Sequence, residues 1–491
     1  MKTAFISVND KTQLERVAKA MTQYDIQLIA SNGTADFLAS KAIAVQSISE
    51  YLQAPPILDG RVKTLHPALF AGILADRHHA HHLQELAQLS ASLIDFVIVD
   101  LYPFSTYQDI EHIDIGGISL IRAAAKNYQY CTVVCEVSDY PLFLNELALH
   151  NGQTELAFRK KMAATAFVKS SRYDAAIASW MLEESSESLR LKKTLALSYG
   201  ENPHQPADFY NLEGELPSIQ LLQGKPLSYN NLLDLDSGIN LIFEFDGTAC
   251  AVIKHTNPCG VAQASSPKEA VEKAFHADSK SAFGGIVILN TALDLSTALF
   301  LKPHFFEVIA APTYTQEALN LLAEKSKCRV VTFMQEKQAS TALRSALNGF
   351  LMQQVDRKDI AFSQETIPTR SKPDPSLYRD MQFAFQVVRH MKSNAIVIVK
   401  GGVTLSLGVG QTNRVDAVSH ALDKISGIDL TDAVLASDGF FPFADSIDLI
   451  AKTSIKTIVQ PGGSLRDSEV IAACDKWGIS MVMTGVRSFK H

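Results

Sequence analysis

The sequence predicts an α/β protein built from two domains that differ in their pattern of strands and helices. In roughly the first 180 residues, strand-like apolar runs alternate with segments of helical spacing, which is typical of a doubly wound parallel sheet. The polar and charged segment 183–193 has the composition of a linker. Beyond it, residues 395–410 predict a hairpin that reverses across Gly401 and Gly402, as in a mixed α/β region. We therefore expect one domain at 1–185 and another at 186–491.

Within the first domain, each expected element has its own signature. The apolar runs at 3–8, 26–30, 96–104 and 131–137 predict buried strands. Residues 11–21 predict a helix, because four apolar side chains keep helical spacing there, namely Leu14, Val17, Ala18 and Met21. A turn at 31–34 leads into a further helical stretch. In the second domain, residues 270–285 show a weak sequence similarity to the segments 421–425 and 436–443. This similarity is compatible with two similar subdomains.

Composition excludes several classes of protein. The chain has 491 residues, of which 47% are hydrophobic and 20% charged, as expected for a globular protein with sizeable cores. Its formal net charge of −7 argues against a nucleic-acid partner but leaves room for a local basic pocket that binds a phosphorylated small molecule. No apolar run approaches membrane-spanning length, so we expect no signal peptide and no anchor. Cys131 and Cys135 stand four apart on one expected strand, which does not suit a disulfide, so reduced thiols in a cytoplasmic protein are expected.

Three stretches of the first domain could bind an anion. The turns at 8–12 and 30–34 place small polar residues and a glycine where helices are expected to begin. Unpaired N–H groups at such helix starts suit a phosphate, although the same residue types also serve as ordinary caps. Residues 59–67 crowd Arg61, Lys63 and His66 beside a glycine and a proline, which fits either a basic site or a charged surface.

A further stretch, residues 113–128, combines an acid with basic side chains. Asp114 precedes a paired glycine, and Arg122 and Lys126 stand four apart on an expected helix, hence on one face. Such a pair ordinarily faces solvent. Together with the glycine turn, Asp114 and Lys126 could instead orient a substrate and transfer its protons.

In the second domain, residues 251–262 (AVIKHTNPCGVA) hold the strongest candidates for chemistry. His255 is a better base candidate than His204, because Lys254 beside it can bias the imidazole towards its neutral, proton-accepting form. A turn at 256–258 would let Lys254 and His255 serve one pocket, although successive strand residues point to opposite faces. We expect Cys259 to pack, with a nucleophile paired to His255 as the alternative.

Metal and dinucleotide chemistry lack support in the sequence. A zinc deaminase would need H-x-E and P-C-x-x-C, but position 262 is Ala and no His is followed two residues later by Glu. His78 and His82 have a metal-capable spacing, yet no nearby cysteine or paired carboxylate completes the ligand set, so a solvated helix face is expected. The glycines at 408 and 410 lack the third glycine of a dinucleotide loop.

Taken together, short blocks spread in order over residues 4–491 resemble one known family. They read SVNDKT, SNGT, DGRVKTLHP, DLYPF, IDIGG, RAAAKN, YGENPHQ, YNNLLDLD, KHTNPCG, SAFGG, ASDGFFPFADS, QPGGSLRD and TGVRSFKH. The family is the bifunctional AICAR transformylase/IMP cyclohydrolase of purine biosynthesis. The resemblance implies a methylglyoxal-synthase-like N-terminal domain and two cytidine-deaminase-like subdomains without zinc. It also implies formyl transfer from 10-formyltetrahydrofolate to AICAR in the C-terminal half, and dehydrative closure of the product, FAICAR, to IMP in the N-terminal half.

The resemblance also assigns roles to individual residues. His255 is the implied base of formyl transfer and Lys254 its charge-stabilising partner, while Lys126 transfers protons in ring closure and Asp114 orients the reacting groups with Tyr102. The implied nucleotide-binding positions of the cyclohydrolase are Ser7, Asn9, Lys11, Ser31, Gly33, Thr34, Arg61 and Lys63. Those on the AICAR side of the transformylase are Tyr199, His204, Gly284, Glu307, Asn394, Arg414 and Arg487, and those on the folate side are Phe440, Asp445, Gly462 and Gly463. The family forms homodimers with transformylase sites at the subunit interface, and a monovalent cation is a further family-based expectation.

The chain departs from the family pattern at a few positions. Ser198 stands where the family usually has Arg, which removes a phosphate contact. Asn9, Asn32 and Ser488 also replace more usual residues, but none of these changes touches the implied catalytic side chains. Two alternatives to the bifunctional enzyme therefore stay open. One is an enzyme that retains only cyclohydrolase activity, and the other is a non-catalytic regulator that binds purine nucleotides.

Overall fold

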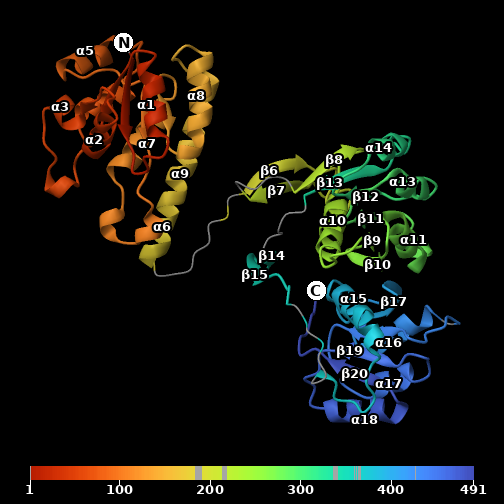
Figure 1. Ribbon diagram of the computed structural model, residues 1–491. Helices are drawn as coiled ribbons and strands as arrows, with labels where there is room; N and C mark the ends of the chain where they lie inside the picture. Colours follow the sequence, from red (N-terminus) through yellow and green to blue (C-terminus); the bar gives the residue numbers. More distant parts are fainter. Residues whose placement is uncertain are drawn as a thin grey trace. The chain divides into compact units, whose positions relative to one another are not determined.

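The computed structural model describes residues 2–182, 189, 191–212, 218–334, 341–358, 360, 362, 366–425 and 427–491. The chain forms two compact units, Met1–Leu189 and Arg190–His491 (Figure 1). Of the linker expected at 183–193, residues 183–188 and 190 lie outside the described residues. Among the helices of the described part, none is long and apolar enough to cross a membrane.

The first unit contains a five-stranded sheet in which every neighbouring pair is parallel. Its strands are β1 (Lys2–Ser7), β2 (Ile26–Ala30), β3 (Gln46–Ser47), β4 (Phe96–Val99) and β5 (Thr132–Val134), in the order β3-β2-β1-β4-β5. The predicted doubly wound parallel sheet is confirmed. Because the chain moves from β1 to β3 in one direction and then crosses to β4 on the other side, the carboxyl ends of β1 and β4 form a topological switch point, where ligands of such sheets bind.

Two groups of helices pack around this sheet: α1 with α8, and α7 with α4 and α9. The helices are α1 (Leu14–Thr22), α2 (Asn32–Ser40), α3 (Ile48–Leu52), α4 (Pro67–Leu74), α5 (Ala80–Gln88), α6 (Phe104–Tyr107), α7 (Gly116–Lys126), α8 (Tyr140–Leu149) and α9 (Leu156–Leu182). The four apolar side chains that predicted α1 are all completely buried. The strand expected at 96–104 ends earlier, at Val99, because the next residue, Asp100, directs its carboxylate to the backbone of the Asn9 turn.

The second unit is built on a mixed sheet of eleven strands, in the order β20-β19-β18-β16-β17-β10-β9-β11-β12-β13-β8. Their bounds are β8 (Ile219–Gln223), β9 (Ala249–Lys254), β10 (Asn257–Gln263), β11 (Ile286–Leu289), β12 (Val308–Ala311), β13 (Arg329–Phe333), β16 (Ile396–Lys400), β17 (Val403–Gly408), β18 (Val434–Ser437), β19 (Thr457–Gln460) and β20 (Ser480–Met483). The predicted hairpin across Gly401 and Gly402 is confirmed as β16–β17. Two small hairpins complete the unit: β6 (Leu191–Ala196) with β7 (Asp208–Leu212), and β14 (Thr341–Ala346) with β15 (Gly349–Gln354).

This large sheet contains the same chain path twice. In each half a helix precedes an antiparallel hairpin, and three parallel strands with intervening helices follow. The helices of the first half are α10 (Tyr229–Ile242), α11 (Pro267–Ala277), the short α12 (Ser279–Ala282), α13 (Leu295–Leu301) and α14 (Gln316–Ala323); those of the second are α15 (Tyr378–Arg389), α16 (Arg414–Asp423), α17 (Asp445–Ile450) and α18 (Asp467–Trp477). The halves join where β10 pairs antiparallel with β17, green beside blue in Figure 1. The second unit therefore consists of two subdomains of one topology.

The antiparallel junction decides which strand ends meet. Following the pairing across the sheet, the carboxyl ends of β9, β17, β18, β19 and β20 lie at the same edge as the amino ends of β10, β11, β12 and β16. We call this edge the β9 edge. Matched strands of the two subdomains run in opposite directions, so the hairpin turn of the second subdomain lies at the opposite edge.

Candidate functional site

A polar cluster lies at the carboxyl ends of β1 and β2. The amine of Lys11 donates a hydrogen bond of 3.0 Å to Oγ1 of Thr34 and a second bond to the carbonyl of Val8, the residue after Ser7. Oγ of Ser31 lies 3.1 Å from the same Thr34 oxygen. Burial lowers the pKa of Lys11. The structure thus brings together candidate positions from two separate sequence blocks.

The start of α2 beside this cluster offers donors to an anion. Ser31 precedes the helix without capping it through its side chain, so the first N–H groups of α2 have no side-chain acceptor there. A methyl group added at Gly33 would meet nothing within 4 Å, which leaves open space at the helix start. This arrangement favours the phosphate-binding interpretation of residues 31–34 over an ordinary cap.

Asp100, which the sequence did not single out, links the two strands of the switch point. It follows β4 directly, and its carboxylate accepts the N–H groups of Asn9 at 2.5 Å and of Asp10 at 2.8 Å. Burial raises the pKa of Asp100. Its sequence signal was available, since it is the first polar residue after a buried apolar run.

Asp114 lies just before α7 and is held by several hydrogen bonds. Its carboxylate accepts the N–H of Gly117 at 2.6 Å, and its own N–H donates to the hydroxyl of Tyr173 at 2.8 Å. Burial raises the pKa of Asp114, and the nearby Asp100 carboxylate raises it further. Asp114 therefore gives up its proton less readily than an exposed aspartate does, as groups at functional sites often do.

The paired glycine is required by close packing at the start of α7. A Cβ at Gly117 would fall 2.5 Å from the Asp114 carboxylate. A Cβ at Gly116 would fall 2.6 Å from Oγ1 of Thr64. The glycines thus let the acid and the segment that carries Arg61 and Lys63 approach one helix start.

The remaining candidates of the first unit lie on its surface. Arg61 is exposed and ion-paired with Glu111, and Lys63 is exposed one residue before the buried Thr64. Tyr102 is partly exposed, with its ring edge-on to His112 at a centroid distance of 6.3 Å. These side chains are accessible to a ligand that reaches from the switch point towards α7.

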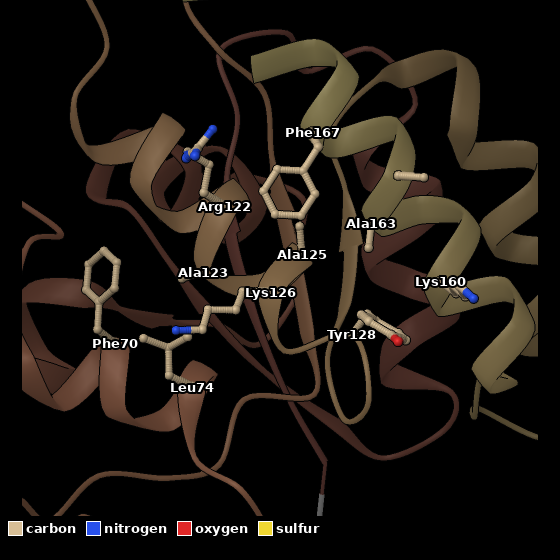
Figure 2. A pocket seen from close by; sticks show the side chains of 11 residues that line it. Phe70, Leu74, Arg122, Ala123, Ala125, Lys126, Tyr128, Lys160, Ala163 and Phe167 are labelled. Carbon is tan, nitrogen blue, oxygen red and sulfur yellow. The ribbon is translucent and has the colours of Figure 1, made fainter. Parts of the chain in front are cut away.

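Lys126 does not lie beside Asp114. It is the last residue of α7, ten residues after the helix begins at Gly116, which places it about 15 Å along the helix axis. There it lines a pocket with Arg122, Phe167 and further apolar side chains, and Figure 2 shows its amine turned towards Leu74. The shared helix face of Arg122 and Lys126 is as the spacing predicted. Asp114 and Lys126 lie towards opposite ends of the helix, so their combination in one proton-transfer set stays a prediction.

In the second unit, Lys254 and His255 lie at the β9 edge. Lys254 is the last residue of β9, and its amine donates to the carbonyl of Phe283 at 2.8 Å. The turn expected at 256–258 lies one residue earlier: Asn257 already begins β10 opposite Lys254, so His255 and Thr256 alone make the turn. Their φ angles of 55° and 63° are those of a two-residue hairpin turn.

Two of the AICAR-side candidates of the first subdomain, Glu307 and Tyr199, are bonded to α10. Glu307 precedes β12 and accepts the side-chain N–H of Asn231 at 3.0 Å. The backbone N–H of Gly284 donates to Phe305 at 2.9 Å, in the segment before β11. The loop that holds Tyr199 and His204 is tied to the start of α10, where Tyr199 accepts the N–H of Tyr229 at 3.4 Å. His204 itself is exposed.

Asn394 and Arg414 are joined to each other inside the second subdomain. Arg414 is buried and donates to the side-chain oxygen of Asn394 at 2.7 Å and to the carbonyl of Ala395 at 3.0 Å. It also forms an ion pair with the completely buried Asp438. The guanidinium thus holds Asn394 in place at the β9 edge, and its bonds within the protein satisfy much of its donor capacity.

The folate-side candidates follow β18 and β19, two parallel neighbours whose carboxyl ends meet at the β9 edge. Phe440 is partly exposed, and Asp445 begins α17. Gly462 and Gly463 adopt φ angles of 73° and 92°, which favour glycine. Arg487 comes from the segment after β20 and lies over the ring of Phe489 at 4.6 Å from its centroid.

The structure also bears on the cysteine and the histidines. Burial raises the pKa of Cys259 to about 11, so little thiolate exists at neutral pH, and the side chain packs against the core of the first subdomain. That supports packing over nucleophilic catalysis. His78 lies outside α5, so it does not share a helix face with His82, whose ring accepts the N–H of Asp76 at 3.1 Å. Within the described residues, no group of three or more His, Cys, Asp or Glu side chains could hold a metal ion.

Comparison with known proteins places these two sites in context. Residues 13–129 match the sequence model of the MGS-like domain, and residues 124–424 match that of the AICARFT/IMPCHase bienzyme. Relatives described as "Bifunctional purine biosynthesis protein PurH" are similar over their whole length. The protein from Clostridium perfringens is 43% identical over 506 residues and the one from Halalkalibacterium halodurans 42% over 511, each covering 100% of both chains. That from Cereibacter sphaeroides is 41% identical over 520 residues, covering 99% of this chain and 98% of its own.

Proposed function

The chain belongs to the AICARFT/IMPCHase bienzyme family, and on this basis we propose how its two units divide the work. It is a bifunctional enzyme of purine biosynthesis, an AICAR formyltransferase and IMP cyclohydrolase. We assign ring closure to residues 1–185 and formyl transfer to residues 186–491. The observation that carries the second assignment is the β9 edge, because strand ends from both subdomains place Lys254, Glu307, Asn394 and Gly462 along this one edge of the sheet.

For formyl transfer, we propose that His255 acts as the base and Lys254 as the stabiliser of charge. The amine of AICAR is conjugated with its imidazole ring, so it attacks the formyl carbon of 10-formyltetrahydrofolate only as its proton is removed. The exposed imidazole of His255 can accept that proton. The amine of Lys254 can stabilise the oxyanion that forms before the bond to the folate nitrogen breaks. Phe440, Asp445, Gly462 and Gly463 are proposed to hold the folate.

For ring closure, we propose that the first unit binds FAICAR with its phosphate at the start of α2. The carboxamide nitrogen then attacks the formyl carbon of the same molecule, and water leaves. Since both groups belong to one substrate, holding them in contact supplies much of the acceleration. We propose that Asp114 orients the reacting groups and exchanges protons with them, with Tyr102 as its neighbour; the raised pKa of Asp114 and its hydrogen bond with the backbone of Tyr102 support this role.

The lysine that completes this site is assigned differently by family resemblance and by geometry. The resemblance gives the role to Lys126. The geometry favours Lys63, because the neighbouring Thr64 contacts the start of α7 where Asp114 lies, whereas Lys126 lies at the other end of the helix. We propose Lys63 as the proton-transfer partner of Asp114 and keep Lys126 as the alternative that experiment must separate from it.

Three further assignments are proposals as well. A homodimer with the transformylase site at the subunit interface is supported by the family resemblance, as is a bound monovalent cation. A cytoplasmic location agrees with six free cysteines, five of which are buried.

Mass-resolved product analysis tests the proposed function. Enzyme, AICAR and 10-formyltetrahydrofolate should give IMP at a rate proportional to enzyme, which would also show that Ser198 is tolerated. Supplying FAICAR alone isolates ring closure. IMP from FAICAR with no consumption of AICAR would identify a cyclohydrolase with an impaired transformylase half, and tight nucleotide binding without any product would identify a regulator.

A further inference from the structure

The two subdomains carry the same hairpin turn with different residues. In the first subdomain, Lys254 pairs with Asn257, and the turn between them is His255-Thr256. In the second, Lys400 pairs with Val403, and the turn is Gly401-Gly402. The φ angles are 55° and 63° in the first turn and 61° and 70° in the second. Glycine adopts such angles freely, whereas a β-branched Thr is strained by them.

A carboxylate from the preceding helix holds each turn. Asp380 of α15 accepts the N–H groups of Gly401 at 2.6 Å and Gly402 at 2.7 Å. Asp234 of α10 accepts the N–H of Thr256 at 2.6 Å, and the N–H of His255 also stabilises its charge. Each subdomain therefore has a helix carboxylate that accepts N–H groups of its hairpin turn, and the residues of the turn differ.

The strained turn has a second support that involves the next turn of α10. Ser237, three residues after Asp234 and hence on the same helix face, donates its hydroxyl to the carbonyl of Thr256 at 2.6 Å. Asn231, three residues before Asp234, bonds to Glu307 on the AICAR side. One face of α10 thus fixes both the turn and a neighbouring binding residue. Strained backbone of this kind persists only where its surroundings over-determine it, and it is concentrated at functional sites.

We propose that Asp234, assisted by Ser237, is a positioning residue for formyl transfer: it holds the His255-Thr256 turn left-handed so that the imidazole faces the AICAR side of the β9 edge. This proposal rests on the proposed role of His255 as the base. Asp234 itself touches backbone and not substrate. Its loss should therefore lower kcat for formyl transfer by misplacing the base while leaving the KM for AICAR near its original value.

The test compares Asp234→Ala and Asp234→Asn with Asp380→Ala, which removes the matching carboxylate from the glycine turn. We expect Asp234→Ala to lower kcat of formyl transfer about 10²-fold, as misplacement by roughly 1 Å can. Asp380→Ala should leave that kcat within about twofold, since its turn lies at the opposite edge. Ring closure of FAICAR, measured on the same samples, controls for the amount of enzyme, and the thermal unfolding of each variant controls for an intact second unit.

A rescue variant separates positioning from general damage. In Asp234→Ala/Thr256→Gly, glycine adopts the positive φ without the carboxylate, so kcat should recover about tenfold or more. The proposal is overturned if Asp234→Ala keeps its kcat, if Asp380→Ala loses as much, or if Thr256→Gly restores nothing. If instead His255→Ala retains formyl transfer, the role proposed for His255 is wrong, whatever Asp234 does.

Discussion

Single residues in this protein act through where the chain puts them. Lys254 ends a strand and His255 begins a turn, so the two can serve one edge although strand neighbours point to opposite faces. Asp114 and Lys126 show the converse: they are close in sequence, but the length of α7 separates them. Residue type suggests chemistry, and the backbone decides whether the chemistry is shared.

Alanine substitutions at Lys63 and Lys126 test which lysine serves ring closure. We expect Lys63→Ala to lower kcat for FAICAR cyclisation by about 10²-fold or more, since proton transfer at the formyl and carboxamide groups is lost. Lys126→Ala should cost less, because its amine lies in the pocket at the far end of α7. Cyclisation is followed with supplied FAICAR, and formyl transfer is the control. A larger loss with Lys126→Ala would instead place the pocket of Figure 2 within the catalytic site.

Asp114→Asn should trade activity for stability in a pH-dependent way. Burial and Asp100 raise the pKa of Asp114, so the charged form is less stable in the folded protein than in the unfolded chain. The folded state therefore loses stability as pH rises through that raised pKa, and the neutral Asn avoids this loss. We expect Tm of the variant to exceed that of the parent at pH 7 and to match it below about pH 4. If the difference in Tm between the variant and the parent does not grow from pH 4 to pH 7, the raised pKa of Asp114 is contradicted.

At the scale of elements, helix starts and hairpin turns carry the sites, and they differ in how visible they are in the sequence. Helix α1 and the Gly401-Gly402 hairpin were predictable, because apolar spacing and a glycine pair are local signals. The His255-Thr256 turn was predicted one residue too late, since neither residue is a usual turn former and the contact with Asp234 is made across the fold. The position of Asp100 at the end of a buried strand was visible in the sequence, but its contact with the Asn9 turn was not, because that turn is remote in sequence.

Alanine substitutions at two glycines test whether each glycine is needed for close packing or leaves space for a ligand at the start of its helix. Gly117→Ala should lower stability by about 1–3 kcal/mol and impair ring closure, because its Cβ would meet the Asp114 carboxylate at 2.5 Å. Gly33→Ala should leave the folded state intact, since nothing lies within 4 Å, yet raise the KM for FAICAR by filling space at the start of α2. Thermal unfolding and cyclisation kinetics on both variants check this, and equal effects on Tm would contradict it.

At the scale of the whole molecule, each unit has its own sheet and its own candidate site. The cluster proposed for ring closure lies at the switch point of a parallel sheet, and the residues proposed for formyl transfer lie along one edge of a mixed sheet. The sequence alone revealed the two domains, with their different patterns of strands and helices, and most of the candidate residues. It could not reveal that residues from 254 to 487 share one edge, because that depends on the antiparallel junction of β10 with β17.

Separate sites predict complementation between variants. His255→Ala should fail to convert AICAR and Gly117→Ala should accumulate FAICAR, while an equimolar mixture of the two proteins should make IMP. The reason is that each protein keeps one intact unit, and FAICAR released by one can enter the other. Time courses of AICAR, FAICAR and IMP measure this. Equal loss of both activities in folded His255→Ala would refute the division between units.

The two matched hairpin turns of the second unit differ in their residues, although the two subdomains share one topology. Two identical polypeptides paired through the strand that corresponds to β10 and β17 would carry the same turn on opposite edges, and any change in one would appear in the other. Within a single chain that constraint is absent. One turn carries a pair of glycines and the other an imidazole, so a scaffold of two matched halves can hold one specialised centre.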